Sequence, residues 1–230
     1  MTDSLQKYLA EVFGTFTLIF IGTLGVLAAR GQLDTSVVVI SLAFGFALVA
    51  ALYAFGEVSG GHFNPIVTLA IVLDRRLDTK DAVPYWVAQF AGAVLASLCV
   101  LIAFDQNAVE LTATAPGPVG AWEALFLEAL ASAIFVLVIL RVTESGKFGA
   151  TAFLAIPLTL AAVNFALAPF TGASVNPARS FGPALIGATW DDFWVYVVGP
   201  PLGAILGWLV YAVVVKAMPG TPAEEAKAAV

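Results

Sequence analysis

The sequence has little charge and few of the side chains that enzymes and metal proteins rely on. Only 11% of its 230 residues are charged and 60% are hydrophobic, with one cysteine and one histidine. So few charges exclude an ordinary soluble surface. Cys99 cannot form an intrachain disulfide, and His62 alone cannot build a multi-histidine metal site. We therefore expect an all-α integral membrane protein that has no metal, no cofactor and no nucleic-acid partner.

Long apolar stretches are what the sequence has instead. A membrane-spanning helix needs about 20 mostly apolar residues, and six stretches reach that length. Two shorter apolar runs each follow an Asn-Pro pair and are too short to span, so we expect them to be re-entrant half-helices. The expected spans are Leu9–Ala29, Val37–Gly56, Ala82–Phe104, Ala121–Leu140, Phe148–Ala168 and Phe193–Val215, and the half-helices are Ile66–Leu73 and Ala178–Ile186.

The basic residues predict the orientation, because short cytoplasmic loops retain positive charge. With six spans, eight of the ten lysines and arginines fall on one side. We therefore expect both termini to be cytoplasmic, with a short tail over residues 217–230, in a plasma (inner) membrane. The eight residues are Lys7, Arg75, Arg76, Lys80, Arg141, Lys147, Lys216 and Lys227.

An internal repeat divides the chain into halves, about 5–104 and 120–216, of one domain covering 1–230. Residues 59–65 (SGGHFNP) align with residues 171–177 (TGASVNP), and Glu11 aligns with Glu128 at a slightly different offset. Each half has three spans, an odd number, so the second half enters the membrane inverted relative to the first. The two half-helices then dip in from opposite faces and meet near the midplane.

The Asn-Pro pairs read as helix starts, since asparagine is a favoured N-cap and proline suits the first helical position. Two inverted starts at bilayer depth indicate more than capping, because irregular backbone there must be buried in protein or line a wet cavity. We expect the preceding segments to offer pore-lining carbonyls. These are Gly60, Gly61, His62 and Phe63 in the first half and Gly172, Ala173 and Ser174 in the second.

Converging helix N-termini, each carrying roughly half an elementary charge, favour neutral solutes over cations. Asn64 and Asn176 can donate hydrogen bonds to a passing water. Arg179, inside the second half-helix, is expected to face the pore, with a structural ion pair to Glu128 as the alternative. Glu11 and Glu128 are interpreted as supports for loop backbone, with a proton relay as the less favoured alternative. For His62 a packed structural role is favoured over pH gating.

Residues 59–68 (SGGHFNPIVT) and 172–183 (GASVNPARSFGP) resemble the paired signature loops of the aquaporin, or major intrinsic protein, family. The resemblance covers nearly the whole chain and is closer to water channels than to glycerol facilitators. It implies an aquaporin-like bundle of six helices plus two half-helices, usually a homotetramer with one pore per subunit. The signature triplets are Asn64-Pro65-Ile66, where the family usually has alanine third, and Asn176-Pro177-Ala178.

The resemblance also implies a selectivity filter formed by Phe44, Asn164, Ala173 and Arg179. Water-selective members usually have histidine at the position of Asn164, so this filter is expected to be wider while still polar. We expect a passive channel for water and small neutral solutes. A glycerol, urea or ammonia facilitator is the alternative, an alternating-access transporter is a weaker one, and an intramembrane enzyme is disfavoured because the spans hold no catalytic cluster.

Overall fold

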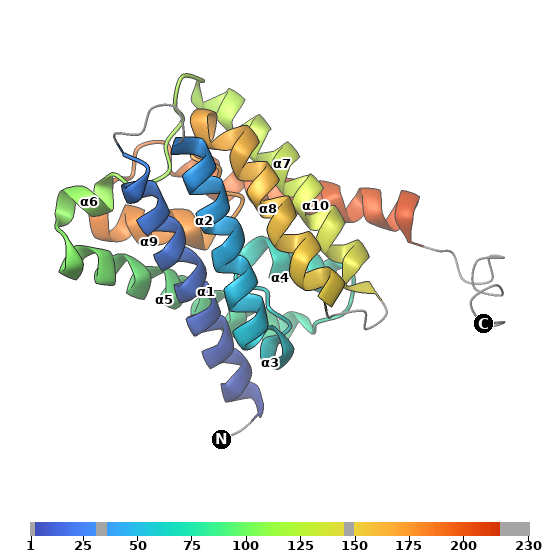
Figure 1. Ribbon diagram of the computed structural model, residues 1–230. Coiled ribbons are helices and arrows are strands. Elements are labelled where there is room, and N and C mark those ends of the chain that lie inside the picture. The colour runs from blue at the N-terminus through green and yellow to red at the C-terminus, as the bar shows by residue number, and fades with distance from the viewer. Residues whose placement is uncertain (1–2, 31–35, 145–149, 217–230) are drawn as a thin grey trace, which may run out of the picture.

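The computed structural model describes residues 3–30, 36–144 and 150–216, and within them every regular element is a helix (Figure 1). The prediction of an all-α fold is confirmed. The elements are α1 (Asp3–Ala28), α2 (Ser36–Ala51) continuing through the π-helical turn η1 (Leu52–Gly56) into α3 (Glu57–Ser59), α4 (Pro65–Leu73), α5 (Thr79–Ala103), α6 (Gln106–Glu110), α7 (Ala121–Val142), α8 (Ala150–Thr171), α9 (Pro177–Gly187), and α10 (Trp194–Val210) continuing as η3 (Tyr211–Val215).

Six of these helical segments are long and apolar enough to span a membrane, as the sequence predicts. Several extend beyond the expected apolar stretch: α1 begins at Asp3 rather than Leu9, and the second span reaches Ser59 rather than Gly56. Helical hydrogen bonding continues past the hydrocarbon layer because the polar end residues tolerate water. The expected start of the fifth span at Phe148, together with Lys147, Lys227 and the tail 217–230, lies outside the described residues.

The outer surface of the bundle is apolar. Ile102, Trp122 and Val213 expose 82%, 73% and 81% of their area respectively, and a soluble protein would bury such side chains. An integral membrane protein instead turns them towards lipid, which confirms the membrane assignment.

Glycines set the close packing inside each half. A Cβ on Gly92 of α5 would lie 2.3 Å from the Val12 carbonyl oxygen of α1, and one on Gly203 of α10 would lie 2.1 Å from the Ala129 oxygen of α7. Small residues at such crossings let helix backbones approach closely in the absence of water. The same contact thus recurs between the first and third spans of both halves.

The half-helices join the two halves together. α4, from the first half, packs against α7 and α10 of the second, whereas α9 packs mainly against α5 of the first half, beside which it lies in Figure 1. α4 and α9 also contact each other. Each half-helix therefore packs against spans of the other half as well as of its own, and the site between them exists only when both halves are folded.

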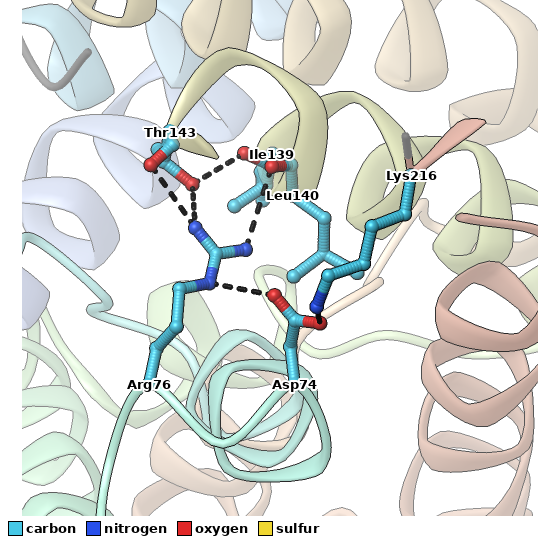
Figure 2. A network of polar contacts seen from close by, with 6 residues as sticks. All are labelled: Asp74, Arg76, Ile139, Leu140, Thr143 and Lys216. Atoms are coloured by element: carbon cyan, nitrogen blue, oxygen red, sulfur yellow. Dashed lines mark hydrogen bonds and ion pairs between the residues drawn. The ribbon is translucent and has the colours of Figure 1, made fainter. Parts of the chain in front are cut away.

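A polar network fixes the far end of α4 (Figure 2). Asp74, whose side chain is only 5% exposed, pairs with Arg76 (Nε to Oδ2, 2.9 Å) and with Lys216 (Nζ to Oδ1, 2.7 Å). The Arg76 guanidinium also donates to the carbonyls of Thr143 and Leu140 at the end of α7. These are terminal carbonyls that a helix leaves unpaired, and a cation suits that end of the helix. The network ties α4 to the ends of α7 and η3.

Candidate functional site

A cavity of about 310 Å³ lies inside the bundle and is lined by residues of both half-helices. At one end it reaches Lys7, Arg76 and Thr143, and elsewhere it reaches Arg179. Ten of the site residues expected from the sequence line it: Phe44, Gly60, Gly61, His62, Asn64, Asn164, Ala173, Ser174, Asn176 and Arg179.

Each half-helix begins at its asparagine. The backbone of Asn64 is extended, and its Oδ1 accepts a hydrogen bond from the Ile66 N–H at 3.1 Å, with Pro65 in the first turn. Asn176 Oδ1 likewise accepts from the N–H groups of Ala178 (3.0 Å) and Arg179 (3.3 Å), after Pro177. Both capping expectations therefore match the observed geometry.

The asparagine amides form a contact that the sequence did not suggest. Asn64 Nδ2 donates to the carbonyl oxygen of Val175 at 2.8 Å, and Asn176 Nδ2 donates to the carbonyl oxygen of Phe63 at 3.1 Å. Each side chain thus caps its own half-helix with its oxygen and holds the opposite loop with its nitrogen. The Phe63 carbonyl, expected to line the pore, is an acceptor in this pair.

The loops before the half-helices have an unusual backbone. Gly60, Gly61 and Gly172 have positive φ, which glycine adopts at little cost. Phe63, Ala173 and Val175 also have positive φ, between +40° and +48°, and such residues cost about 1–3 kcal/mol each unless the surroundings hold them. A group that binds the loop backbone is therefore required. The residues of these two loops that have positive φ are Gly60, Gly61, Phe63, Gly172, Ala173 and Val175.

Glu11 supplies that group in the first half. Fully buried on α1, it accepts hydrogen bonds from the backbone N–H groups of His62 (3.0 Å) and Phe63 (2.7 Å). The Ser59 hydroxyl (2.6 Å) and the Gln89 amide (2.7 Å) donate to the same carboxylate. Four donors on one buried carboxylate give it the supporting geometry, because buried carboxylates need such partners.

Glu128 repeats the arrangement in the second half. Its carboxylate accepts from the backbone of Ser174 (2.8 Å) and Val175 (2.7 Å) and from the Thr171 hydroxyl (2.7 Å). Among the described residues, no ion pair joins Glu128 to Arg179 within 4 Å. The alternative of a structural Glu128–Arg179 pair is therefore wrong for this geometry.

Several residues that support the loops were not predicted from the sequence. Tyr85 Oη donates to the Ser59 carbonyl at 2.7 Å and Tyr196 Oη to the Thr171 carbonyl at 2.8 Å. Each anchors the residue from which its half's loop leaves the preceding helix. Aligning the repeat over its whole length would have found this pair, and the lone amide of Gln89 inside a span would have indicated a partner.

Arg179 and Phe44 face each other in the cavity. The Arg179 guanidinium carbon lies 5.1 Å from the centroid of the Phe44 ring, and its Nη1 donates to the Thr112 carbonyl at 2.9 Å. Its Nε has no partner among the described residues although it is buried. Thr112 therefore fixes the head of the side chain, while the buried Nε is left without a hydrogen-bond partner in the described part of the chain.

Asn164 also lines this cavity. Its Nδ2 donates to the Leu160 carbonyl at 3.0 Å, one turn back on α8. A carbonyl can only accept, so this bond fixes the orientation of the amide, whose buried Oδ1 has no partner among the described residues. Asn164 is 1% exposed and lines the cavity.

His62 is packed rather than free. It is 8% exposed, its Nδ1 lies 3.0 Å from Thr68 Oγ1, and its ring lies 5.0 Å from that of Tyr85. Ile66, the departure from the family triplet, is fully buried in the hydrophobic core beside the first asparagine. The geometry therefore matches the structural interpretation of the histidine.

Six helices long and apolar enough to span a membrane, packed around a cavity lined by two half-helices that contact each other, define a transmembrane channel. The family model for the major intrinsic proteins matches residues 1–211. Glycerol uptake facilitator protein-like 6 of Lactiplantibacillus plantarum is 44% identical over 88% of this chain and 94% of its own length. Aquaporin Z of Rhodopseudomonas palustris is 37% identical, over 90% and 92% respectively.

The X-ray structure of the aquaglyceroporin from Plasmodium falciparum has the same fold, with a TM-score of 0.82 at 23% identity, covering 92% of this chain and 97% of that one. The chain belongs to the major intrinsic protein family. Members of this family are passive channels and not enzymes, so the expectation of a non-enzymatic membrane channel is confirmed.

Proposed function

We propose that this protein is a channel for water that also passes small neutral solutes and excludes protons and other ions. The observation that carries this proposal is the joining of two opposed helix N-termini at Asn64 and Asn176, inside a continuous cavity that also contains Arg179. Aligned peptide dipoles place roughly half a positive charge at each N-terminus. Neutral molecules feel little of that field, whereas cations are repelled.

The asparagine amides add orientation to this repulsion. Each Nδ2 carries two hydrogens, and one of them is used in the bond to the opposite loop. The second is available to donate to the oxygen of a water at the midpoint. A water that accepts from both amides turns its own hydrogens away from the two asparagines, so it relays protons poorly along the file.

The filter is proposed to consist of Phe44, Asn164, Ala173 and Arg179. Arg179 lines the cavity and can only donate hydrogen bonds, so it suits a small molecule that accepts them, as water does. Water makes such a contact without needing a wide opening. Glycerol or urea is the second candidate solute, favoured by the short side chain of Asn164 and by the 44% identity to a protein named a glycerol uptake facilitator.

The assembly and placement are also proposals. We infer a homotetramer in a plasma (inner) membrane, with both termini cytoplasmic and residues 217–230 forming a cytoplasmic tail. The halves 5–104 and 120–216 make one domain over 1–230. Cross-linking in native membranes tests the tetramer, and labelling of a cysteine introduced beside Lys7 tests the side on which the chain begins.

Stopped-flow light scattering on proteoliposomes tests the proposed function. Osmotic water flow is compared with glycerol and urea uptake and with proton leak reported by an enclosed pH dye. We expect water flow well above that of bare lipid without a matching proton leak. We also expect Arg179→Ala and Asn164→Gly to raise urea or glycerol uptake relative to water, since each removes bulk and a polar contact from the filter. Free ion passage without accelerated osmotic flow would refute the proposal.

A further inference from the structure

Phe44 owes its position to a glycine on the neighbouring helix. Gly22 lies buried on α1, and a Cβ built on it would lie 2.2, 2.4 and 2.6 Å from three carbon atoms along one edge of the Phe44 ring. Ordinary van der Waals contact begins near 3.4 Å. The ring therefore occupies space that any other residue at position 22 would fill.

A second neighbour of the ring is Arg179, whose guanidinium carbon lies over the ring, 5.1 Å from its centroid. Phe44 thus approaches α1 with one edge of its ring, has the arginine over the ring, and lines the cavity with 3% of its area exposed. A ring displaced from α1 by a side chain at position 22 has empty space available only on the cavity side, since protein interiors are otherwise densely packed.

The alternative response, a retreat of α1, is resisted by its second neighbour. α1 lies against α5 so closely that a Cβ on Gly92 would be 2.3 Å from the Val12 carbonyl oxygen and 3.0 Å from the Phe16 nitrogen. Backbone atoms in such close contact cannot move aside as a side chain can. The ring, free to turn about its own bonds, is the part that moves.

We infer that Gly22 is a positioning residue for the selectivity filter: by leaving room for the Phe44 ring against α1, it sets how far that ring reaches into the cavity that Arg179 also lines. The inference rests on the proposed function, in which Phe44 and Arg179 form the filter. A methyl group at position 22 would move the ring by roughly 1 Å towards the cavity, and pore width at a constriction controls which molecules pass.

The test is a double-mutant cycle between positions 22 and 44, read as water permeability per channel in proteoliposomes. We expect Gly22→Ala to lower water permeability at least about threefold and to raise its activation energy, because the narrower gap hinders even water. In the Phe44→Leu background the same glycine substitution should have no effect, since the ring edge that it would strike is gone. An equal loss in both backgrounds, or no loss in either, overturns the inference.

Gly25→Ala is the matched control. It adds the same methyl group to the same helix and the same interface, 2.3 Å from the Cβ of Ala43 rather than from an aromatic ring. It should change water permeability much less than Gly22→Ala, and an equal loss would mean that general separation of α1 and α2 is responsible. Should Gly22→Ala fail to fold, recovery of folded protein by adding Phe44→Leu supports the inference and failure to recover it overturns it.

Phe44→Leu alone separates this inference from the proposed filter. If that variant leaves the permeability ratio of urea to water unchanged, Phe44 does not form the constriction and the proposed filter fails. If Phe44→Leu raises the ratio but Gly22→Ala does not change water permeability, the proposed filter is supported and only the role of Gly22 is refuted.

Discussion

Asn64 and Val175 are joined by a 2.8 Å hydrogen bond although 111 residues separate them in the chain. The reciprocal bond joins Asn176 to Phe63 at 3.1 Å. These bonds connect the loop of each half to the half-helix of the other, at the place where the two helix N-termini meet. The asparagines that cap the half-helices therefore also join the two inverted halves by hydrogen bonds.

Replacing Asn64 by alanine should destabilise the protein by about 1–3 kcal/mol, because the fully buried carbonyl of Val175 loses its donor and the Ile66 N–H loses its acceptor. The measurement is the midpoint of thermal unfolding in detergent. Asn107→Ala is the control, since Asn107 is exposed on α6. Equal midpoints for the two variants would show that the cross-connection contributes nothing to stability.

Glu128→Gln should lower stability although it preserves size. Three donors, from Thr171, Ser174 and Val175, converge on the carboxylate. An amide has one oxygen, so at least one donor would face the new NH₂ group, at about 1–3 kcal/mol for each unpaired group. Glu123→Gln, on the exposed face of the same helix, should have no effect. Comparable unfolding curves for both variants would contradict the supporting role.

Asp74→Asn should release the end of α4. The substitution removes the charge that pairs with Arg76 and Lys216 at 2.9 and 2.7 Å (Figure 2). We expect a loss of about 1–2 kcal/mol, less than for a fully buried pair because Lys216 is nearly half exposed. Asp78→Asn is the control, since the Asp78–Lys80 pair is exposed on both sides. Limited proteolysis of the α4–α5 connection provides the readout, and equal cleavage rates would refute the expectation.

Gly14 and Phe63 form a size-matched pair. A Cβ on Gly14 would lie 2.0 Å from the Phe63 ring, whereas the repeat places Ala131 and Val175 at the corresponding positions. Gly14→Ala should therefore destabilise the protein by about 1–3 kcal/mol through overpacking. Adding Phe63→Val, which reproduces the combination of the second half, should restore much of that loss. Additive destabilisation in the double variant would rule out direct coupling.

Much of the architecture was predictable from local sequence. Long apolar stretches can only be helices in lipid, and the Asn-Pro pairs carry their own start signal. The boundaries were less well predicted at Asp3 and Ser59, since hydropathy reports the membrane layer and not the end of the helix. The supporting role of the glutamates was an interpretation that the hydrogen bonds of Glu11 now match.

The polar partners were harder to predict. Tyr85 and Tyr196 reach carbonyls more than 20 residues away, and Arg76 reaches the end of α7. Nothing in the local sequence around these residues indicates which distant carbonyl each of them contacts. The crossing of the half-helices into opposite halves likewise follows from packing between segments that are distant in the chain.

The sequence by itself determined that this chain lives in a membrane, that it has six spans and two half-helices, and that its halves are inverted copies. The composition and the odd number of spans in each half are enough for these conclusions, because lipid forces every backbone polar group to be satisfied within its own segment or by protein. Only the tertiary structure decided the positions of Phe44, Arg179 and the free oxygen of Asn164. These depend on Gly22, Thr112 and Leu160, whose contacts arise only when the helices pack.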